Sequence, residues 1–381
     1  MNTKLAYSLC ICIYAKIYVN LFWRLRILNK LVLIDGNSLS FRAFYALPLL
    51  SNHAGIHTNA VYGFAMLLEK IIKEEKPNHF LVAFDAGKTT FRHSKYSEYK
   101  GGRQKTPPEL SEQFPYIRQL LDAYHIKRYE LDNYEADDII GTLSRQADEE
   151  DFETIIITGD RDLTQLATDN VTIYYTKKGV TDVDHYTPKF IAEKYNGLVP
   201  KQIIDMKGLM GDTSDNIPGV AGVGEKTAIK LLNQFESVEG VYEHIEEVTA
   251  KKLKEKLINS KDDALMSKDL ATINVHSPIE VSLEDTKLTL QDDTTEKIEL
   301  FKKLEFKQLL ADIDTSSTNE EVIDKTFEIE QDFQNVDLND LNEAVIHFEL
   351  EGTNYLKDTI LKFGFYTNHQ HVVINAEDVK D

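Results

Sequence analysis

Carboxylates stand at the ends of several predicted secondary-structure elements. Three aspartates each follow a short run of mainly apolar and β-branched residues: Asp35, Asp85 and Asp160. Such runs predict strands, here over residues 31–34, 80–84 and 154–158. These three positions are the first part of a candidate catalytic site.

A second set of carboxylates opens predicted helices and turns. Glu135 and Asp138 are three residues apart and share one face of a helix, and Asp137 lies in the same first turn. The remaining members belong to two Gly-Asp motifs: Asp162, Asp212 and Asp215. Taken singly, each cluster is more typical of a capped helix start or a Gly-Asp turn than of a ligand.

Helical patterns alternate with the predicted strands. Apolar residues recur at helical spacing over residues 59–75, and residues 109–124 and 135–150 also predict helices. Strands that alternate with helices predict the α/β class, with a mostly parallel sheet covered on both faces. Ligands of such sheets gather beyond the carboxyl ends of the strands, so we expect the acidic positions to converge on one edge.

Converging carboxylates repel one another unless cations neutralise them. Oxygen ligands without cysteine favour Mg²⁺, with Mn²⁺ as an alternative ion. Two such ions about 4 Å apart can hold the attacking water and the leaving oxygen of a phosphodiester. The acidic residues therefore indicate metal-dependent hydrolysis of phosphodiester bonds.

A basic segment follows Asp85 in the sequence. Residues 88–105 carry six Lys and Arg against the single acid Glu98, and aromatic residues stand between them. Cations hold phosphates and aromatic rings stack on bases, so the segment suits a nucleic-acid strand. Without the carboxylates, a solvated loop with buried tyrosines would be the better interpretation.

A glycine-rich turn spans residues 219–224 and leads into a helical pattern at 225–235. Backbone N–H groups at a helix start, followed by Lys226, suit a phosphodiester that is held without reading bases. Glycines that only pack a helix–turn–helix are the alternative. Asp212 and Asp215, just before the turn, favour the binding interpretation.

The composition fits a folded protein that acts on nucleic acid. The chain of 381 residues has a formal net charge of −20, and 42% of it is hydrophobic. The negative total does not exclude a nucleic-acid partner, because the basic segment is local. The two cysteines are Cys10 and Cys12, so the rest of the chain offers no cysteine for a disulfide or a metal, which fits a reducing cytoplasm.

The first thirty residues are apolar, but Lys16 interrupts them and no small-residue cleavage site follows. A membrane span needs about 20 mainly apolar residues, which this segment reaches only by tolerating the lysine. We expect residues 1–30 to be an extension outside the fold and expect no membrane partner; a weak membrane anchor is the less favoured alternative.

From Leu31 to about residue 315, the motifs resemble the 5′ nuclease domain that begins bacterial DNA polymerase I, a relative of phage 5′ exonucleases and eukaryotic flap endonucleases. The resemblance rests on six ordered motifs: LIDGNS (33–38), VAFD (82–85), FR (91–92) with YKGGR (99–103), YEADD (134–138), TGDRD (158–162) and GDTSDNIPGVAGVGEKTA (211–228).

The resemblance implies a PIN-like α/β core, a helical arch and a helix–three-turn–helix DNA-binding module. It assigns four residues to a first metal ion: Asp35, Asp85, Glu135 and Asp137. A second ion would be held by Asp137 or Asp138 together with four further aspartates: Asp160, Asp162, Asp212 and Asp215.

The resemblance also implies roles for basic and turn residues. Lys100 and Arg103, together with Arg92, would stabilise the charge that develops on the scissile phosphate. The expected DNA contacts are Lys95, Tyr99, Gly219, Gly222, Gly224, Lys226 and Thr227. K⁺ is a further ion expected at the helix–three-turn–helix turn.

The expected domains follow these motifs. They are an extension at 1–30, the PIN-like core at 31–199, the helical DNA-binding region at 200–315, an acidic linker at 316–335 and the start of a degenerate exonuclease-like domain at 336–381. In the last segment, His347-Phe348-Glu349 stands where a proofreading domain would show Asp-x-Glu, so we expect no proofreading. Because the chain ends at Asp381, we expect no polymerase activity.

The implied substrates are DNA with a 5′ flap or nick and RNA primers, in replication and repair, and the chain is expected to act as a monomer. Two alternatives stay open: a DNA-junction-binding module without catalysis, and a PIN-type ribonuclease. The filled carboxylate positions count against the first alternative. The module after Asp212 counts against the second.

Overall fold

The computed structural model describes residues 29–318, apart from 88, 178–181 and 290–294, and three strands at 345–350, 360–366 and 371–375. The chain divides into two units, Met1–Asp312 and Ile313–Asp381, and each is described by itself. Apart from their inner ends, the expected extension at 1–30 and linker at 316–335 lie outside the described residues. Within the described residues, no helix has the length and apolar character needed to cross a membrane.

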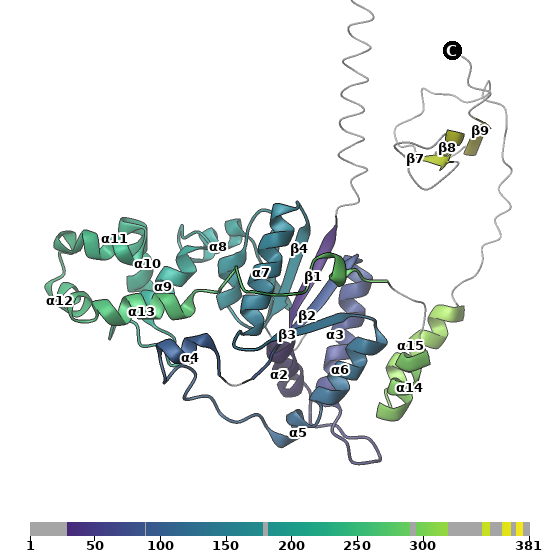
Figure 1. The fold of residues 1–381 in the computed structure, drawn as a ribbon, viewed down its shortest axis with the longest axis horizontal. Helices are drawn as coiled ribbons and strands as arrows, with labels where there is room; N and C mark the ends of the chain where they lie inside the picture. The colour runs from purple at the N-terminus through teal and green to yellow at the C-terminus, as the bar shows by residue number, and fades with distance from the viewer. Residues whose placement is uncertain are drawn as a thin grey trace, which may run out of the picture. The chain divides into compact units, whose positions relative to one another are not determined.

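A six-stranded sheet forms the centre of the first unit, in the order β3-β2-β1-β4-β5-β6 (Figure 1). Its strands are β1 (Lys30–Asp35), β2 (His79–Asp85), β3 (Lys127–Leu131), β4 (Glu153–Thr158), β5 (Val171–Thr176) and β6 (Val183–Tyr186). Neighbours from β3 to β5 pair in parallel, and β6 pairs antiparallel with β5. The three predicted strands and the mostly parallel sheet are confirmed.

Both faces of the sheet are covered, so its central strand is a continuous apolar run. In β1, Leu31 and Leu33 pack with the buried face of α7 (Ala136–Glu149), which lies across β1 to β4. Val32 and Ile34 alternate to the opposite face, where α2 (Gly36–Ala46) and α3 (Asn59–Glu75) lie, followed by α6 (Phe114–Ala123). The helix predicted over 59–75 is α3 itself.

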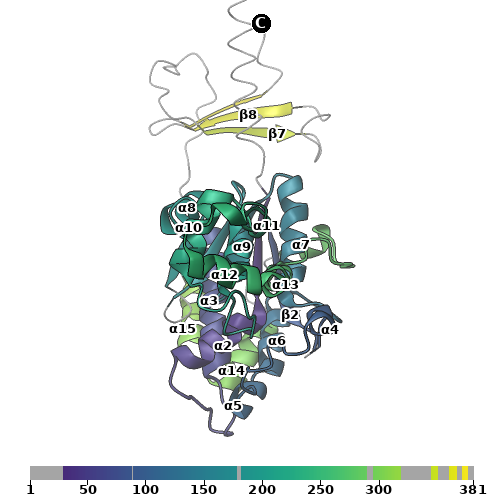
Figure 2. The same cartoon turned by 90° about the vertical axis from the view of Figure 1, so that its left-hand side faces the viewer.

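The region after the sheet is helical (Figure 2). It contains α8 (Pro188–Lys194), α9 (Gln202–Met210), α10 (Glu225–Phe235), α11 (Val238–Glu243), α12 (Lys251–Asn259) and α13 (Lys261–Ala271). The helix predicted over 225–235 is confirmed as α10. Residues 211–224 form the turn between α9 and α10, and Gly211, Gly219 and Gly222 have positive φ there. Two further helices, α14 (Thr295–Leu304) and α15 (Lys307–Thr318), follow, and the short 3-10 helices are η1 (Asp162–Leu166), η2 (Ile245–Glu247) and η3 (Glu284–Thr286).

The segment expected to form a helical arch is less helical than the resemblance implied. It contains α4 (Phe91–Lys95) and α5 (Pro108–Ser111), and turns and irregular backbone connect them. Gly101, Gly102 and Pro107 stand in this connection, and both residue types disfavour a continuous helix. The predicted helix over 109–124 is likewise divided into α5 and α6.

The second unit contains a three-stranded antiparallel sheet of β7 (Val345–Leu350), β8 (Ile360–Tyr366) and β9 (His371–Asn375). The apolar run at 344–350 indicates a strand in the sequence and corresponds to β7, whereas β8 and β9 were not predicted. The side chains of the motif at 347–349, on which the expectation of absent proofreading rests, lie outside the described residues.

Candidate active site

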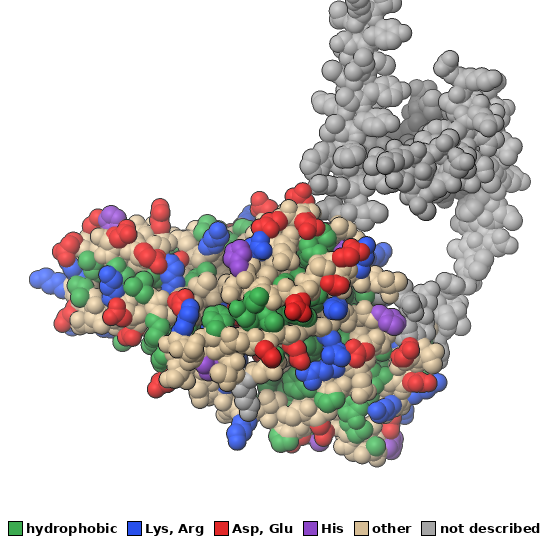
Figure 3. Space-filling view, viewed as in Figure 1, with side chains coloured by type: hydrophobic (Ala, Val, Ile, Leu, Met, Phe, Trp, Pro, Cys, Tyr) green, Lys and Arg blue, Asp and Glu red, His purple; other side chains and the backbone are tan. Residues whose placement is uncertain are grey.

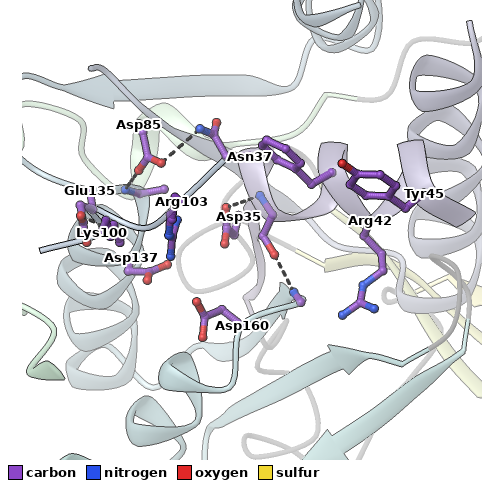
Figure 4. A pocket seen from close by; sticks show the side chains of 14 residues that line it. Asp35, Asn37, Arg42, Tyr45, Asp85, Lys100, Arg103, Glu135, Asp137 and Asp160 are labelled. Carbon is purple, nitrogen blue, oxygen red and sulfur yellow. Dashed lines mark hydrogen bonds and ion pairs between the residues drawn. The ribbon is translucent and has the colours of Figure 1, made fainter. Parts of the chain in front are cut away.

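A pocket of about 380 Å³ opens at the carboxyl edge of the sheet (Figure 4). Five of the predicted carboxylates line it: Asp35, Asp85, Glu135, Asp137 and Asp160. They come from the ends of β1, β2 and β4 and from the start of α7, as the alternation of strands and helices predicted. Lys100 and Arg103 line the same pocket.

Helix starts fix the orientation of these carboxylates. Asp35 is the N-cap of α2, and its Oδ1 accepts a hydrogen bond from the backbone N–H of Ser38 at 2.9 Å. Asp85 accepts from the backbone N–H of Ala136 at 2.8 Å, at the first turn of α7, and from Nδ2 of Asn37 at 3.1 Å. The strand ends and the helix starts are therefore joined through the acids themselves.

The electrostatics of the pocket favour a bound cation. Burial, together with the negative charge of the neighbouring Asp85, raises the pKa of Asp35 to about 7. Burial also raises the pKa of Asp85, and burial together with Asp35 raises that of Asp137. Buried carboxylates that repel one another are stabilised by positive charge, and hard oxygen donors fit Mg²⁺ or Mn²⁺.

Basic side chains of the protein itself already contact several of the acids. Nζ of Lys100 lies 2.8 Å from Oε1 of Glu135, and Nη2 of Arg103 lies 2.5 Å from Oδ1 of Asp215. In the part of the chain that the structure describes, no three acidic or histidine side chains lie at the spacing needed to ligate one metal ion. Glu135 and Asp215 are thus held by basic side chains of the protein itself.

The expected ligands of the second ion form a neighbouring cluster. Asp162 and Asp212 share the ammonium of Lys207, a residue of α9. Asp215 binds Arg103 and accepts a hydrogen bond from the hydroxyl of Tyr99 at 3.3 Å. These three aspartates are not among the residues that line the pocket, although Arg103 links Asp215 to it.

Two predicted site residues are placed away from the pocket. The guanidinium of Arg92 is buried and binds both oxygens of Asp138, each at 2.8 Å. Asp138 is fully buried, so its oxygens do not face the pocket. The structure corrects both expectations, because this buried pair leaves neither group at a position to contact a phosphate or to ligate a metal with the other acids.

Two expected DNA contacts are also corrected. Tyr99 is buried and its hydroxyl donates to Glu135, so its ring is not available to stack on a base. Gly219 is buried as well, and Oγ of Ser267 accepts its backbone N–H at 2.9 Å. By contrast, Gly222, Gly224 and Lys226 are exposed, Thr227 is partly exposed, and Lys95 lies at the surface in an ion pair with Asp269.

Several pocket residues were not predicted from the sequence. Phe41, Arg42 and Tyr45 project from α2 into the lining, and Figure 4 shows Arg42 and Tyr45 across from Lys100 and Glu135. Asn37 and Ser38 lie within the motif at 33–38, which could have indicated them. No sequence motif marks Tyr45 as a pocket residue. Only the structure shows that it is 70% exposed at the pocket.

Charges of both signs cover the visible face of the described part. Figure 3 shows acidic side chains spread over this face, with lysines and arginines between them. A uniformly positive surface is therefore not the basis of any strand binding on this face. Lys100 and Arg103 are local positive groups that line the pocket.

Two protein-family models match this chain in succession. The N-terminal resolvase-like domain of 5′-3′ exonuclease matches residues 30–196, and the C-terminal SAM fold of 5′-3′ exonuclease matches residues 198–294. The chain belongs to the 5′-3′ exonuclease family. As a member of this family it is a nuclease that hydrolyses phosphodiester bonds, as the acidic residues indicated.

Curated relatives of this exonuclease-family chain are much longer than the chain itself. It is 56% identical to DNA polymerase I of Bacillus subtilis over 362 residues, which are 93% of this chain and 41% of that protein. It is 60% identical to DNA polymerase I of Bacillus caldotenax over 294 residues, which are 77% of this chain and 33% of that protein. The chain thus spans only about a third to two fifths of these relatives, at 33% and 41%.

Solved structures share the fold. The 5′-exonuclease of bacteriophage T5 with bound zinc is 25% identical, with a TM-score of 0.54 over 64% of this chain and 90% of that one. A flap endonuclease variant of bacteriophage T5, in a pseudo-enzyme-product complex with DNA and metal ions, is 21% identical, with a TM-score of 0.53 over 76% of this chain and 98% of that one. The predicted PIN-like α/β fold with a helical second region is confirmed.

Proposed function

We propose that this chain is a structure-specific 5′-3′ exonuclease and 5′-flap endonuclease that uses two divalent cations, and that it removes RNA primers in replication and trims DNA in repair. The observation that carries the proposal is the pocket in which carboxylates from three strand ends and one helix start face two basic side chains. Phosphoryl-transfer hydrolysis needs carboxylates that metal ions can neutralise. It also needs basic side chains that can then move from the carboxylates to a phosphate.

The acidic residues divide between two metal positions in this proposal. Asp35, Asp85, Glu135 and Asp137 would hold a first ion, and Asp160 with Asp162, Asp212 and Asp215 a second. When bound, Mg²⁺ or Mn²⁺ would activate a water and neutralise the leaving oxygen. Burial of Asp35 and Asp137 supports this division, since desolvated carboxylates gain most from a bound cation.

Lys100 and Arg103 are proposed to stabilise the scissile phosphate. Each is paired with a predicted metal ligand, Lys100 with Glu135 and Arg103 with Asp215. A cation that neutralises Glu135 or Asp215 would release the paired basic side chain to the phosphate oxygens, where charge develops in the transition state.

The rim of the pocket and the turn after α9 are proposed to hold the nucleic acid on either side of the cut. Tyr45 lines the pocket with an exposed ring and can stack on an unpaired base. Gly222 and Gly224, with Lys226 and Thr227, present the start of α10 to a duplex phosphate, with K⁺ as a further ion at this turn. Lys95 adds a cation near the basic segment.

The substrates are proposed to be DNA with a 5′ flap or nick, and RNA primers. Two similarities support this: the curated relatives are DNA polymerases, and a solved structure with the same fold is named a flap endonuclease in complex with DNA. We propose further that the chain acts as a monomer in the cytoplasm.

The deciding experiment is cleavage of a flap duplex labelled at its 5′ end, in Mg²⁺ and in EDTA. We expect wild type to release the flap only in Mg²⁺, and Asp137→Ala to bind but not cut. Asp132→Ala is the matched control, because Asp132 is exposed just before α7 and does not line the pocket.

The same assay separates the alternatives. Binding of the flap without cleavage by wild type, in any divalent cation, would replace the nuclease by a DNA-junction-binding module. Cleavage of RNA strands but not of DNA flaps would instead favour a PIN-type ribonuclease.

A further inference from the structure

Arg92 lies at the centre of a buried hydrogen-bond network and is 2% exposed. Its Nε donates to the carbonyl of Leu270 at 3.0 Å, and Nη2 donates to that of Thr272 at 2.8 Å. Nη1 and Nη2 donate to the two oxygens of Asp138, and Nη1 also reaches Glu135 at 3.3 Å. A guanidinium has five N–H groups, and these five bonds leave none for a phosphate.

Asp138 extends the network in two directions. Its Oδ1 accepts the backbone N–H of Asn274 at 2.9 Å, and its Oδ2 accepts that of Glu135 at 3.1 Å. Glu135 is the N-cap of α7 and lines the active-site pocket. The Arg92–Asp138 pair therefore joins α4, the first turn of α7 and the segment that leaves α13.

The carbonyls that Arg92 binds close the end of α13. Leu270 is in the last turn of this helix and Thr272 is its C-cap, where carbonyls lack partners within the helix and a positive charge is favoured. Earlier in α13, Oγ of Ser267 accepts the buried N–H of Gly219. One side of α13 thus holds the glycine turn, and its end is held by Arg92.

We propose that Arg92 is a positioning residue that, through Asp138, fixes Glu135 and the start of α7 against α13, and so couples the DNA-binding turn to the active-site carboxylates. This inference rests on the proposed function. It assigns Arg92 to the cleavage step without any contact to the substrate. Loss of Arg92 should therefore slow cleavage of bound DNA and leave the affinity for DNA nearly unchanged.

The test is a double-mutant cycle on full-length protein with Arg92→Gln, Asp138→Asn and the combination. Single-turnover cleavage of the flap duplex is measured in Mg²⁺, and binding of the same duplex is measured by fluorescence anisotropy in EDTA. We expect each single variant to cleave roughly 10²-fold more slowly, the cost of a misplaced active-site group. The double variant should be no slower than the slower single variant, because both remove one interaction.

Arg128→Gln is the matched control, because Arg128, on β3, forms an exposed ion pair with Asp122 of α6. We expect its cleavage rate to match wild type. Additive losses in the cycle, or a loss of DNA affinity in Arg92→Gln that accounts for its slower cleavage, would overturn the inference and restore a phosphate contact for Arg92. Failure of wild type to cut the flap would instead overturn the proposed function.

A second variant covers the case in which the single variants do not fold. Arg92→Met with Asp138→Leu removes both buried charges together, which cores tolerate far better than one unpaired charge. If this variant melts cooperatively and still cleaves slowly with wild-type DNA affinity, the positioning role stands. Cleavage at the wild-type rate would show that the polar network is dispensable and would overturn it.

Discussion

Nζ of Lys207 lies 2.6 Å from Oδ1 of Asp162, and the same ammonium hydrogen-bonds Asp212. Burial and the neighbouring Asp160 raise the pKa of Asp162 to about 7. For Asp212, burial opposes ionisation, but the hydrogen bonds from Lys207 and Ser214 lower its pKa overall. One ammonium on α9 thus neutralises two carboxylates that the proposed function gives to the second metal ion.

Lys207→Met should make the protein more dependent on divalent cations. The variant leaves Asp162 and Asp212 without their partner, so we expect the free energy of unfolding in EDTA to fall by about 1–3 kcal/mol, the penalty for an unsatisfied charged group. Mg²⁺ should recover more stability in the variant than in wild type, because the freed carboxylates bind it. Thermal melts in EDTA and across a Mg²⁺ titration measure both effects.

Lys230→Met is the control for this experiment, since Lys230 is exposed on α10. It should melt like wild type with and without Mg²⁺. An equal Mg²⁺-induced shift in wild type and Lys207→Met would mean that Lys207 does not occupy a place that a metal ion takes.

Lys100→Ala should impair the chemical step. Its ammonium lines the pocket and is 2.8 Å from Glu135, within reach of a phosphate held between the acids. Removing one group that stabilises developing charge costs about 10²–10³-fold in rate. Single-turnover cleavage measures this loss, and Lys189→Ala, at an exposed position on α8, is the control. A rate within twofold of wild type would remove Lys100 from the mechanism.

Tyr45→Ala should weaken binding of substrates with an unpaired base. Stacking of a base on an aromatic ring contributes about 1–3 kcal/mol, which corresponds to roughly 5–150-fold in affinity. Tyr45→Phe keeps the ring and should bind like wild type. Anisotropy with a flap duplex and with a fully paired duplex separates stacking from general attraction, because the alanine variant should lose affinity for the flap alone.

The sequence predicted the positions of the acids well because strand ends and helix starts are local features. Asp35, Asp85 and Asp160 follow strands whose apolar runs are unmistakable, and parallel pairing brings those ends together. The partners of the basic residues could not be predicted in this way. Arg92 and Asp138 are 46 residues apart, and only the tertiary fold makes them a buried pair.

Strands of low apolar content were also missed. β3 reads Lys-Arg-Tyr-Glu-Leu, and its burial pattern has no fully buried residue because it lies at the edge of the sheet. These residues form a strand because they pair in parallel with β2, where Ala83 lies opposite Tyr129, and not because of their own composition. Edge strands of this kind need the tertiary partner before they can be assigned.

His79 should make stability fall in acid. The ring is buried, its Nδ1 contacts the carbonyl of Leu283, and burial lowers its pKa below the ordinary 6.5 despite that contact. Near pH 6.5 the unfolded chain therefore binds a proton at His79 that the folded state does not bind. The contribution of His79 to the free energy of unfolding is fully present above that pH and is lost as the pH falls below it. The limiting slope is about 1.4 kcal/mol per pH unit.

Urea unfolding of wild type and His79→Gln at pH 7 and pH 5 separates the effect of His79 on stability from that of the buried carboxylates. The drop in unfolding free energy between the two pH values should be smaller in His79→Gln. His276→Gln, at an exposed position, should show the wild-type drop. If all three proteins lose the same stability, His79 is protonated in the folded state and the burial argument is wrong.

A side chain added at Gly219 should destabilise the turn after α9. This residue has φ of +57°, and a Cβ atom there would lie 2.2 Å from the backbone nitrogen of Gly211. The left-handed conformation alone costs a non-glycine residue about 1–2 kcal/mol, and the overlap with backbone cannot be relieved by a side-chain rotation. We therefore expect Gly219→Ala to lower the free energy of unfolding by about 2 kcal/mol or more.

Gly224→Ala is the matched comparison within the same turn. Gly224 has φ of −107°, and a Cβ there meets nothing within 4 Å, so its stability should stay close to wild type. Urea unfolding compares the two variants, and anisotropy with a duplex compares their DNA binding. Because Gly224 is exposed at the start of α10 and Gly219 is buried, a methyl at Gly224 should weaken DNA binding without unfolding the turn. Equal stability of the two variants would mean that the turn can rearrange around Gly211.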